Sequence, residues 1–220
     1  AEVYLAKEGH QGKIGINFLE KIQMPNPASV YGAMLAGVDY ILVGAGIPVE
    51  FPKMLDSFAA GEKAGLKLHV EGAKKEDDYR ISFDPKALFS GEVKKLKRPK
   101  FLAIVSSFIL AVTMAKKVEG VDGLVLENHT AGGHNAPPRG QLHLNEAGEP
   151  IFGPKDEIDY NKISTLGLPY WIAGGYSMPD ALDTAKQEGA KGIQVGSVFA
   201  FCRESGLLKS LKEQFLKAVE

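Results

Sequence analysis

The feature that most constrains the fold is a series of short apolar runs of strand length, separated by segments of helix length. The runs are continuous rather than alternating apolar with polar, which is typical of parallel strands buried on both faces. Strands are predicted at residues 13–18, 39–44, 66–70, 101–105, 123–126, 170–173 and 192–195. Strands that alternate with helices in this way predict a parallel α/β fold.

Helix signals lie between the predicted strands. Asn26 and Pro27 precede the segment ASVYGAMLAG, as a cap and a first-turn proline would. Further helices are predicted over residues 50–60, 108–118 and 177–189. The first nine residues resemble the end of a helix that closes at Gly9.

Two architectures fit this order, an open doubly wound sheet and an eight-stranded barrel. The spacing of roughly 30 residues per strand–helix unit matches a barrel of about 250 residues. No strand precedes the predicted helix that ends at Gly9. We therefore expect residues 1–220 to form a single, partial (β/α)8 barrel of the TIM type that lacks its first strand in this chain.

Two segments interrupt the rhythm of strands and helices. Residues 72–99 contain the charge runs KKEDD and KKLKR, which predict a solvated insertion. Residues 141–153 are predicted to form a β-hairpin with its turn at residues 145–148. Because this hairpin follows a strand end, it could form a lid over a site on that face.

Composition and charge exclude several classes of protein. A hydrophobic content of 45% rules out wholesale disorder. The formal net charge of −1 gives no global electrostatic reason to bind nucleic acid or an anionic membrane, and no apolar run approaches the ~18 residues of a membrane span. Cys202 is the single cysteine and cannot form an internal disulfide, which favours a reducing, cytoplasmic location. Without cysteine pairs or clustered histidines, no metal site is expected.

Glycines follow three of the predicted strands, at the strand ends where parallel α/β folds place their sites. Gly132 and Gly133 lie in the loop after residues 123–126. The last two strands are followed by Gly174, Gly175, Gly196 and Ser197. Exposed backbone N–H groups beside glycines can bind a phosphate, and barrels commonly do so after their last two strands. The alternative is that the glycines only form tight turns.

Two of the five histidines are candidates for a catalytic role. His129 and His134 both lie in the loop after residues 123–126, where a histidine can act as a general base near neutral pH. A hydrogen-bonded loop histidine is the alternative for each. His69 falls in a predicted strand and is expected to be structural, whereas His10 and His143 are expected at the surface.

Four motifs together resemble the nitronate monooxygenase family, formerly called 2-nitropropane dioxygenases. They are GIN at residues 15–17, AGGH at 131–134, IAGGY at 172–176 and IQVGSVFAF at 193–201. Members of the family are FMN-dependent (β/α)8 barrels that oxidise nitronates or nitroalkanes with O₂. Related FMN-dependent enoyl reductases share much of the pattern.

The resemblance implies an FMN cofactor and assigns roles to individual residues. The backbone around Gly174, Gly175, Gly196 and Ser197 would hold the phosphate. Asn17, Glu127, Gly132 and Gly133 would also contact the cofactor. His134 matches the catalytic histidine, which would accept the α-proton of a neutral nitroalkane and stabilise an anionic nitronate. The incomplete dinucleotide fingerprint, with Val49 in place of its third glycine, favours FMN over NAD.

The chain departs from the family pattern at three places. Glu127 stands where many members have glutamine, and its charge would oppose a reduced flavin unless it is protonated or paired. Ser106 and Ser107 stand where many relatives have a basic residue. Arg139, in a proline-rich stretch, could compensate by binding an anionic substrate, or it could be an exposed loop residue.

Two classes of function remain open at this point. The first is an FMN oxidoreductase, either a nitronate-type oxidase or an enoyl reductase that uses NAD(P)H. The second is a non-catalytic barrel that binds flavin or another phosphate ligand. The partners expected for an oxidoreductase are a small-molecule substrate and O₂, and the chain could form an oligomer.

Overall fold

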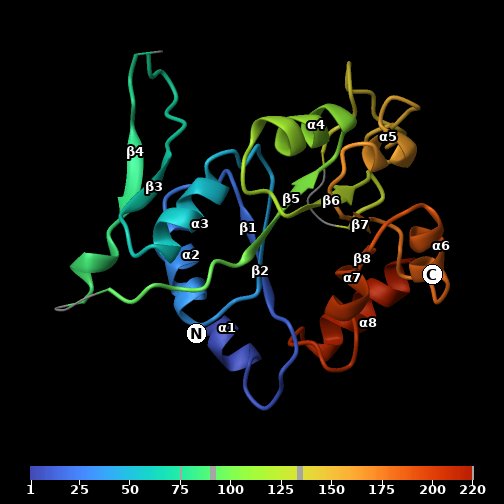
Figure 1. The fold of residues 1–220 in the computed structure, drawn as a ribbon. Coiled ribbons are helices and arrows are strands. Elements are labelled where there is room, and N and C mark those ends of the chain that lie inside the picture. The colour runs from blue at the N-terminus through green and yellow to red at the C-terminus, as the bar shows by residue number, and fades with distance from the viewer. Residues whose placement is uncertain (75, 90–92, 133–135, 220) are drawn as a thin grey trace.

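The centre of the computed structural model is a curled sheet of six parallel strands (Figure 1). The structure describes residues 1–74, 76–89, 93–132 and 136–219. In spatial order the strands are β1 (Gly15–Leu19), β2 (Tyr40–Gly44), β5 (Lys100–Val105), β6 (Gly123–Glu127), β7 (Tyr170–Ala173) and β8 (Gly192–Gln194). Spatial order follows chain order, as in part of a (β/α)8 barrel.

The two faces of this sheet differ in how well they are covered. In a parallel sheet, residues paired across strands share a face, and the next residue along lies on the opposite face. Ile41 and Phe101 are one such pair on the outer face, and both are fully buried. Leu42, the next residue, lies on the inner face and is only half-buried. The inner, concave face is therefore apolar but partly open.

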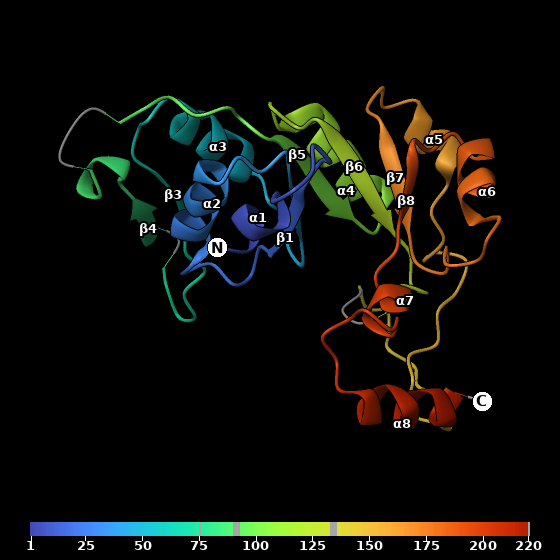
Figure 2. The ribbon, with the colours of Figure 1, turned by 90° about the horizontal axis from the view of Figure 1, so that it is seen from below.

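Helices that follow the strands cover the outer face. The main ones are α2 (Asn26–Leu35), α3 (Phe51–Ala59), α4 (Phe108–Lys117), α5 (Tyr160–Ser164) and α6 (Ala181–Gln187). Their buried side chains form one core cluster with the outward-facing residues of the strands. The short α1 (Glu2–Ala6) precedes β1. Figure 2 shows α7 (Ser197–Ala200) and α8 (Lys209–Val219) on a separate arm, away from α4 and α5.

The start of α2 differs from its prediction. Asn26 is the first residue of the helix rather than its cap, and the capping position is Pro25. The Asn26 side chain is only 2% exposed and donates from Nδ2 to the carbonyl oxygen of Leu19 at 2.9 Å. Asn26 therefore ties the helix to the end of β1, because a buried amide must find a hydrogen-bond partner.

The predicted parallel strand at residues 66–70 is wrong. The chain there forms β3 (Ala64–Lys67), which pairs antiparallel with β4 (Arg80–Phe83) in a separate two-stranded sheet. Leu66 is buried and Lys67 is exposed, so β3 has one covered face, as an antiparallel strand can. His69, predicted to be structural, lies beyond β3 with its side chain 80% exposed.

The charged insertion at residues 72–99 is only partly solvated. It contributes β4, whose Phe83 packs against Tyr31 of α2 with ring centroids 5.2 Å apart. Arg80 also pairs with Glu50 at 2.6 Å. Charge runs therefore indicate the exposed part of this segment, while its apolar residues fasten it to the helical layer.

The segment at residues 141–153 contains one antiparallel bridge, between Leu144 and Pro150. Asn145 N–H donates to the carbonyl of Glu149 at 2.9 Å and closes the turn. Its role as a lid stays a prediction. No helix in the described part of the chain combines the length and apolarity needed to cross a membrane.

Candidate functional site

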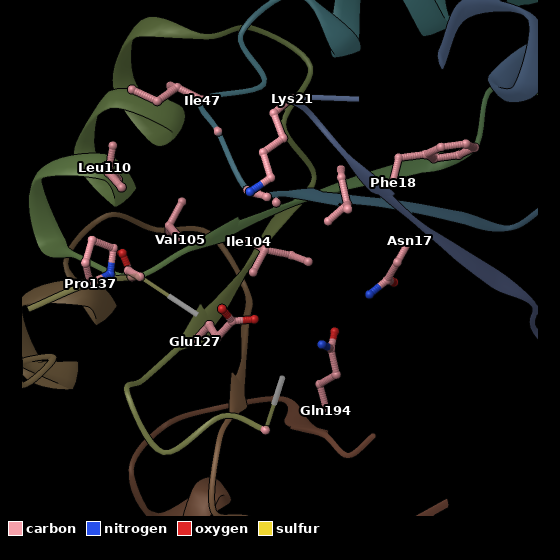
Figure 3. Close-up of a pocket in the computed structure, with 17 residues that line it drawn as sticks. Asn17, Phe18, Lys21, Ile47, Ile104, Val105, Leu110, Glu127, Pro137 and Gln194 are labelled. Carbon is pink, nitrogen blue, oxygen red and sulfur yellow. The ribbon is translucent and has the colours of Figure 1, made fainter. Parts of the chain in front are cut away.

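A cavity of about 540 Å³ lies at the carboxyl ends of the parallel strands. Its walls are largely apolar, with Phe18, Ile47, Ile104 and Leu110 among them. β1, β2, β5, β6 and β8 each contribute residues near their ends, because parallel strands place their carboxyl ends at one edge of the sheet. Figure 3 shows these side chains around the cavity.

Polar side chains meet in this cavity from distant parts of the chain. Figure 3 shows the amides of Asn17 and Gln194 facing one another across the cavity. The Glu127 carboxylate and the Lys21 amine also point into this space, Lys21 from just beyond the end of β1. Register accounts for the grouping: Glu127 and Gln194 both pair with Ala173 and therefore share its face. The loop residue Gly132 borders the same space.

Gln194 and Lys21 were not predicted as site residues. Gln194 is the polar residue between Ile193 and Val195. Its position in an otherwise apolar strand was a signal that it faces away from the core. Lys21 comes two residues after β1 ends, at the functional edge of the sheet.

Glu127 borders three adjoining cavities. It lines the 540 Å³ cavity, a second of about 300 Å³ and a third of about 260 Å³. Burial raises the pKa of its carboxyl above the ordinary value, because an apolar environment disfavours the charged form. This environment favours the protonated form of Glu127. A protonated Glu127 would not oppose the negative charge of a reduced flavin.

The 260 Å³ cavity brings the glycine loops together. Gly174, Gly175, Gly196 and Ser197 all line it, although they follow two different strands. Gly174 has φ +99° and Gly175 has φ +73°, values that L-residues rarely adopt. A Cβ on Gly174 would overlap the side chain of Asn128. The loop can therefore hold this shape only with glycine, and no side chain of its own fills the cavity there.

Gly132 makes a similar close approach. A Cβ at this position would overlap the hydroxyl of Ser197. The backbone of the loop after β6 therefore packs directly against the Ser197 side chain at the start of α7. Gly132, Glu127 and Gln194 line both the 540 Å³ and the 260 Å³ cavities. The two cavities are therefore adjacent.

Arg139 lies on the wall of the 300 Å³ cavity. Its guanidinium donates to the carbonyl oxygen of Ser106 at 2.6 Å and to that of Lys155. Its backbone N–H donates to Asp156 at 2.8 Å. These contacts fasten the loop to the end of β5, and a substrate-binding role for Arg139 stays a prediction.

His129 lines the same 300 Å³ cavity, where its ring stacks on Phe152 with centroids 4.6 Å apart. Gly133 and His134 lie outside the described residues, so the predicted catalytic position of His134 stays a prediction. Among the described residues, no group of three or more His, Cys, Asp or Glu side chains could hold a metal ion.

Comparison with known proteins finds relatives by sequence, although no family model matches. A protein named "Probable nitronate monooxygenase" from Bacillus subtilis (strain 168) is 31% identical over 128 residues, which are 58% of this chain and 35% of that protein. A protein of the same name from Staphylococcus haemolyticus is 28% identical over 129 residues, with the same coverage. The matched segment thus spans 35% of the relatives' length.

Among solved structures, a FabK mutant from Thermotoga maritima has a similar fold. The TM-score is 0.60 at 18% sequence identity, over 98% of this chain and 54% of that chain. Together with the curled parallel sheet, this likeness confirms the predicted partial (β/α)8 barrel. The predicted resemblance to nitronate monooxygenases is likewise confirmed.

Proposed function

We propose that this chain forms the FMN-binding part of a flavin oxidoreductase that oxidises alkyl nitronates or nitroalkanes with O₂. The observation that carries the proposal is the convergence of the Gly174–Gly175 and Gly196–Ser197 loops on one cavity, adjacent to a larger apolar cavity at the strand ends. Sequence similarity to proteins named as probable nitronate monooxygenases supports the choice of reaction.

The residues present fit an FMN group. Gly174 and Gly175, both with positive φ, line the 260 Å³ cavity with backbone and no side chain of their own, which suits a phosphate. The neighbouring cavity of 540 Å³ lies within the range of about 300–1,000 Å³ that is usual for cofactor sites. Its apolar walls suit a flat aromatic ring, and Asn17 and Gln194 offer amide donors and acceptors beside it.

When bound, FMN would supply the redox chemistry. The chain's own groups would bind and orient the substrate. The Lys21 amine, directed into the cavity, favours an anionic substrate such as a nitronate. A protonated Glu127 would add no opposing negative charge, and His134 would take the α-proton of a neutral nitroalkane.

The test is the absorbance spectrum of the purified protein, followed by anaerobic titration with a nitronate and then with NADPH. We expect bound flavin that is bleached by the nitronate and recovers its colour when air is admitted. Bleaching by NADPH alone would instead indicate an NAD(P)H-dependent reductase. A protein without flavin that cannot be reconstituted with FMN would refute the proposal.

A second prediction concerns His134→Asn. A general base contributes about 10²–10⁴ in rate, so turnover of a neutral nitroalkane should fall by about that factor. Turnover of the preformed nitronate should fall less, because that substrate is already deprotonated. His129→Asn is the matched control, because this histidine lies in the same loop but stacks on Phe152. Equal losses for both substrates would assign His134 to binding rather than to proton transfer.

A further inference from the structure

A network of tyrosines and one glutamate lies beside the glycine loop that follows β7. Tyr176, the residue after Gly174 and Gly175, donates from its hydroxyl to Oε2 of Glu188 at 2.8 Å. Glu188 is the residue that ends α6. Both side chains are half-buried, so water competes only weakly for this hydrogen bond. The pair thus links the glycine loop to the far end of the helix that follows it.

Three further groups hold the same network in place. Tyr170, on β7, donates from its hydroxyl to the backbone carbonyl of Glu188. Its ring stacks on that of Tyr160 in α5, with centroids 6.4 Å apart and planes within 4° of parallel. Burial raises the pKa of the Tyr160 hydroxyl, and the nearby Tyr176 and Asn128 side chains act to lower it. β7, α5 and α6 therefore all contribute to the position of Tyr176.

Asn128 connects this network to the opposite side of the loop. Its Nδ2 donates to the carbonyl oxygen of Gly174 at 3.4 Å, and its Oδ1 accepts from the backbone N–H of Thr130 at 2.9 Å. Gly174 is therefore held between Asn128 on one side and Tyr176, two residues along the chain, on the other. A segment with two left-handed glycines has much conformational freedom, so external contacts of this kind must fix its shape.

The Tyr176–Glu188 pair is charge-assisted. Burial, together with the hydrogen bonds to Tyr160 and Glu188, raises the pKa of the Tyr176 hydroxyl far above its usual range. The hydroxyl therefore keeps its proton and remains a donor to the carboxylate. Hydrogen bonds to an ionised acceptor are stronger than those between neutral groups, so this pair is the firmest link in the network.

We infer that Tyr176 and Glu188 are positioning residues that hold the backbone of Gly174 and Gly175 in the shape that binds a phosphate group. The inference rests on the proposed FMN site and adds a determinant of its specificity. Because the pair acts on the phosphate end of the cofactor, it should contribute to the binding of FMN and not to that of riboflavin, which has the same ring system without the phosphate.

The experiment measures the dissociation constants of FMN and riboflavin by quenching of flavin fluorescence. The variants are Tyr176→Phe, which keeps the ring, and Glu188→Leu, which removes the acceptor. We expect each to weaken FMN binding about tenfold, as loss of one hydrogen bond to a charged group does. Riboflavin binding should be unchanged. Glu188→Gln keeps an oxygen acceptor and should recover most of the FMN affinity.

The matched control is Tyr79→Phe. It also removes a tyrosine hydroxyl, but from an exposed residue just before β4, which belongs to the separate two-stranded sheet. We expect it to leave the FMN-to-riboflavin ratio unchanged. The double variant Tyr176→Phe/Glu188→Leu should bind FMN no more weakly than either single variant, because both remove the same interaction.

Each other outcome overturns the inference in a recognisable way. Equal losses of FMN and riboflavin would show that the pair only stabilises the fold, which a parallel loss in the urea unfolding midpoint would corroborate. Unchanged FMN affinity would show that the loop keeps its shape unaided. If the unmodified protein binds neither flavin, the proposed function fails and the inference with it. If that protein binds FMN and the variants do so equally, only the inference fails.

Discussion

At the scale of single residues, the feature with the clearest physical consequence is the half-buried carboxyl of Glu127. Burial raises its pKa, and no charged partner is among the causes of that shift. In the unfolded chain the pKa of the same carboxyl would be about 4.3. The folded protein therefore binds more protons than the unfolded chain between that pH and the raised value, and its stability falls as the pH rises through this window.

Glu127→Gln removes this titration while keeping nearly the same shape. We expect the variant to have a higher melting temperature than the unmodified protein at pH 7, because the glutamine carries no charge to bury. The difference should vanish at pH 4, where the carboxyl is protonated in the folded state. Thermal unfolding followed by circular dichroism between pH 4 and 8 measures this. A constant difference at every pH would show that proton binding is not the cause.

The alternation of side chains between the two faces of a strand helps to explain which residues of the candidate site could be predicted from the sequence. Asn17, Glu127 and the glycines after β7 and β8 follow from motifs and from the rule that sites lie at strand ends. Gln194 was missed although it is polar in an apolar strand, and its pairing with Ala173 shows that it shares a face with Glu127. Arg139 stays a predicted substrate contact, and its hydrogen bonds to the backbone carbonyls of Ser106 and Lys155 could not be predicted from the sequence. Loop packing of this kind depends on distant residues.

At the scale of elements, the β3–β4 hairpin is where pattern and structure differ most. The run at residues 66–70 predicts a barrel strand because it is continuous and of strand length. The deciding contacts are local and antiparallel: Leu66 pairs with Ile81, and Gly65 pairs with Ser82. The partner strand, β4, lies within the charged segment at residues 72–99. An apolar run considered by itself does not show whether its partner is parallel or antiparallel. The other six predicted strands correspond to the six parallel strands of the sheet, although β1 is not fully buried on either face.

Gly65→Ala tests this element separately from the barrel. A Cβ at this position would overlap the backbone of Ile81 and Ser82, so the two strands could not stay paired. We expect backbone amides at residues 64–67 and 80–83 to exchange with deuterium at least about tenfold faster, as expected when local opening becomes easier. Exchange in β5 and β6 should not change.

Gly153→Ala is the control for this experiment, because an added Cβ there meets nothing within 4 Å. Unchanged exchange in Gly65→Ala would mean that the hairpin is not held by strand pairing. Faster exchange throughout the sheet would mean that the hairpin and the barrel strands unfold as one unit.

At the scale of the whole molecule, stability should reside mainly on the helix-covered face of the sheet. Ile41→Ala removes a fully buried side chain between strand and helices, and should lower the free energy of unfolding by about 2–5 kcal/mol. Leu42→Ala changes the adjacent residue on the partly open face, and should lower it by less than half as much. Urea unfolding of the two variants gives the comparison, and equal losses would contradict this division between the faces.

The connection between β2 and β5 also has a consequence for how the molecule can vary. These strands are neighbours in the sheet, with Tyr40 beside Lys100, although the β3–β4 hairpin and its flanks lie between them in the chain. The entropy of closing such a connection grows only with the logarithm of its length, at about 0.6 kcal/mol per doubling. Added length in this connection therefore costs little closure entropy, provided that Phe83 and Leu66 keep their packing against the helical layer. The chain can therefore lengthen or shorten at this point while the strand ends that form the cavities keep their register.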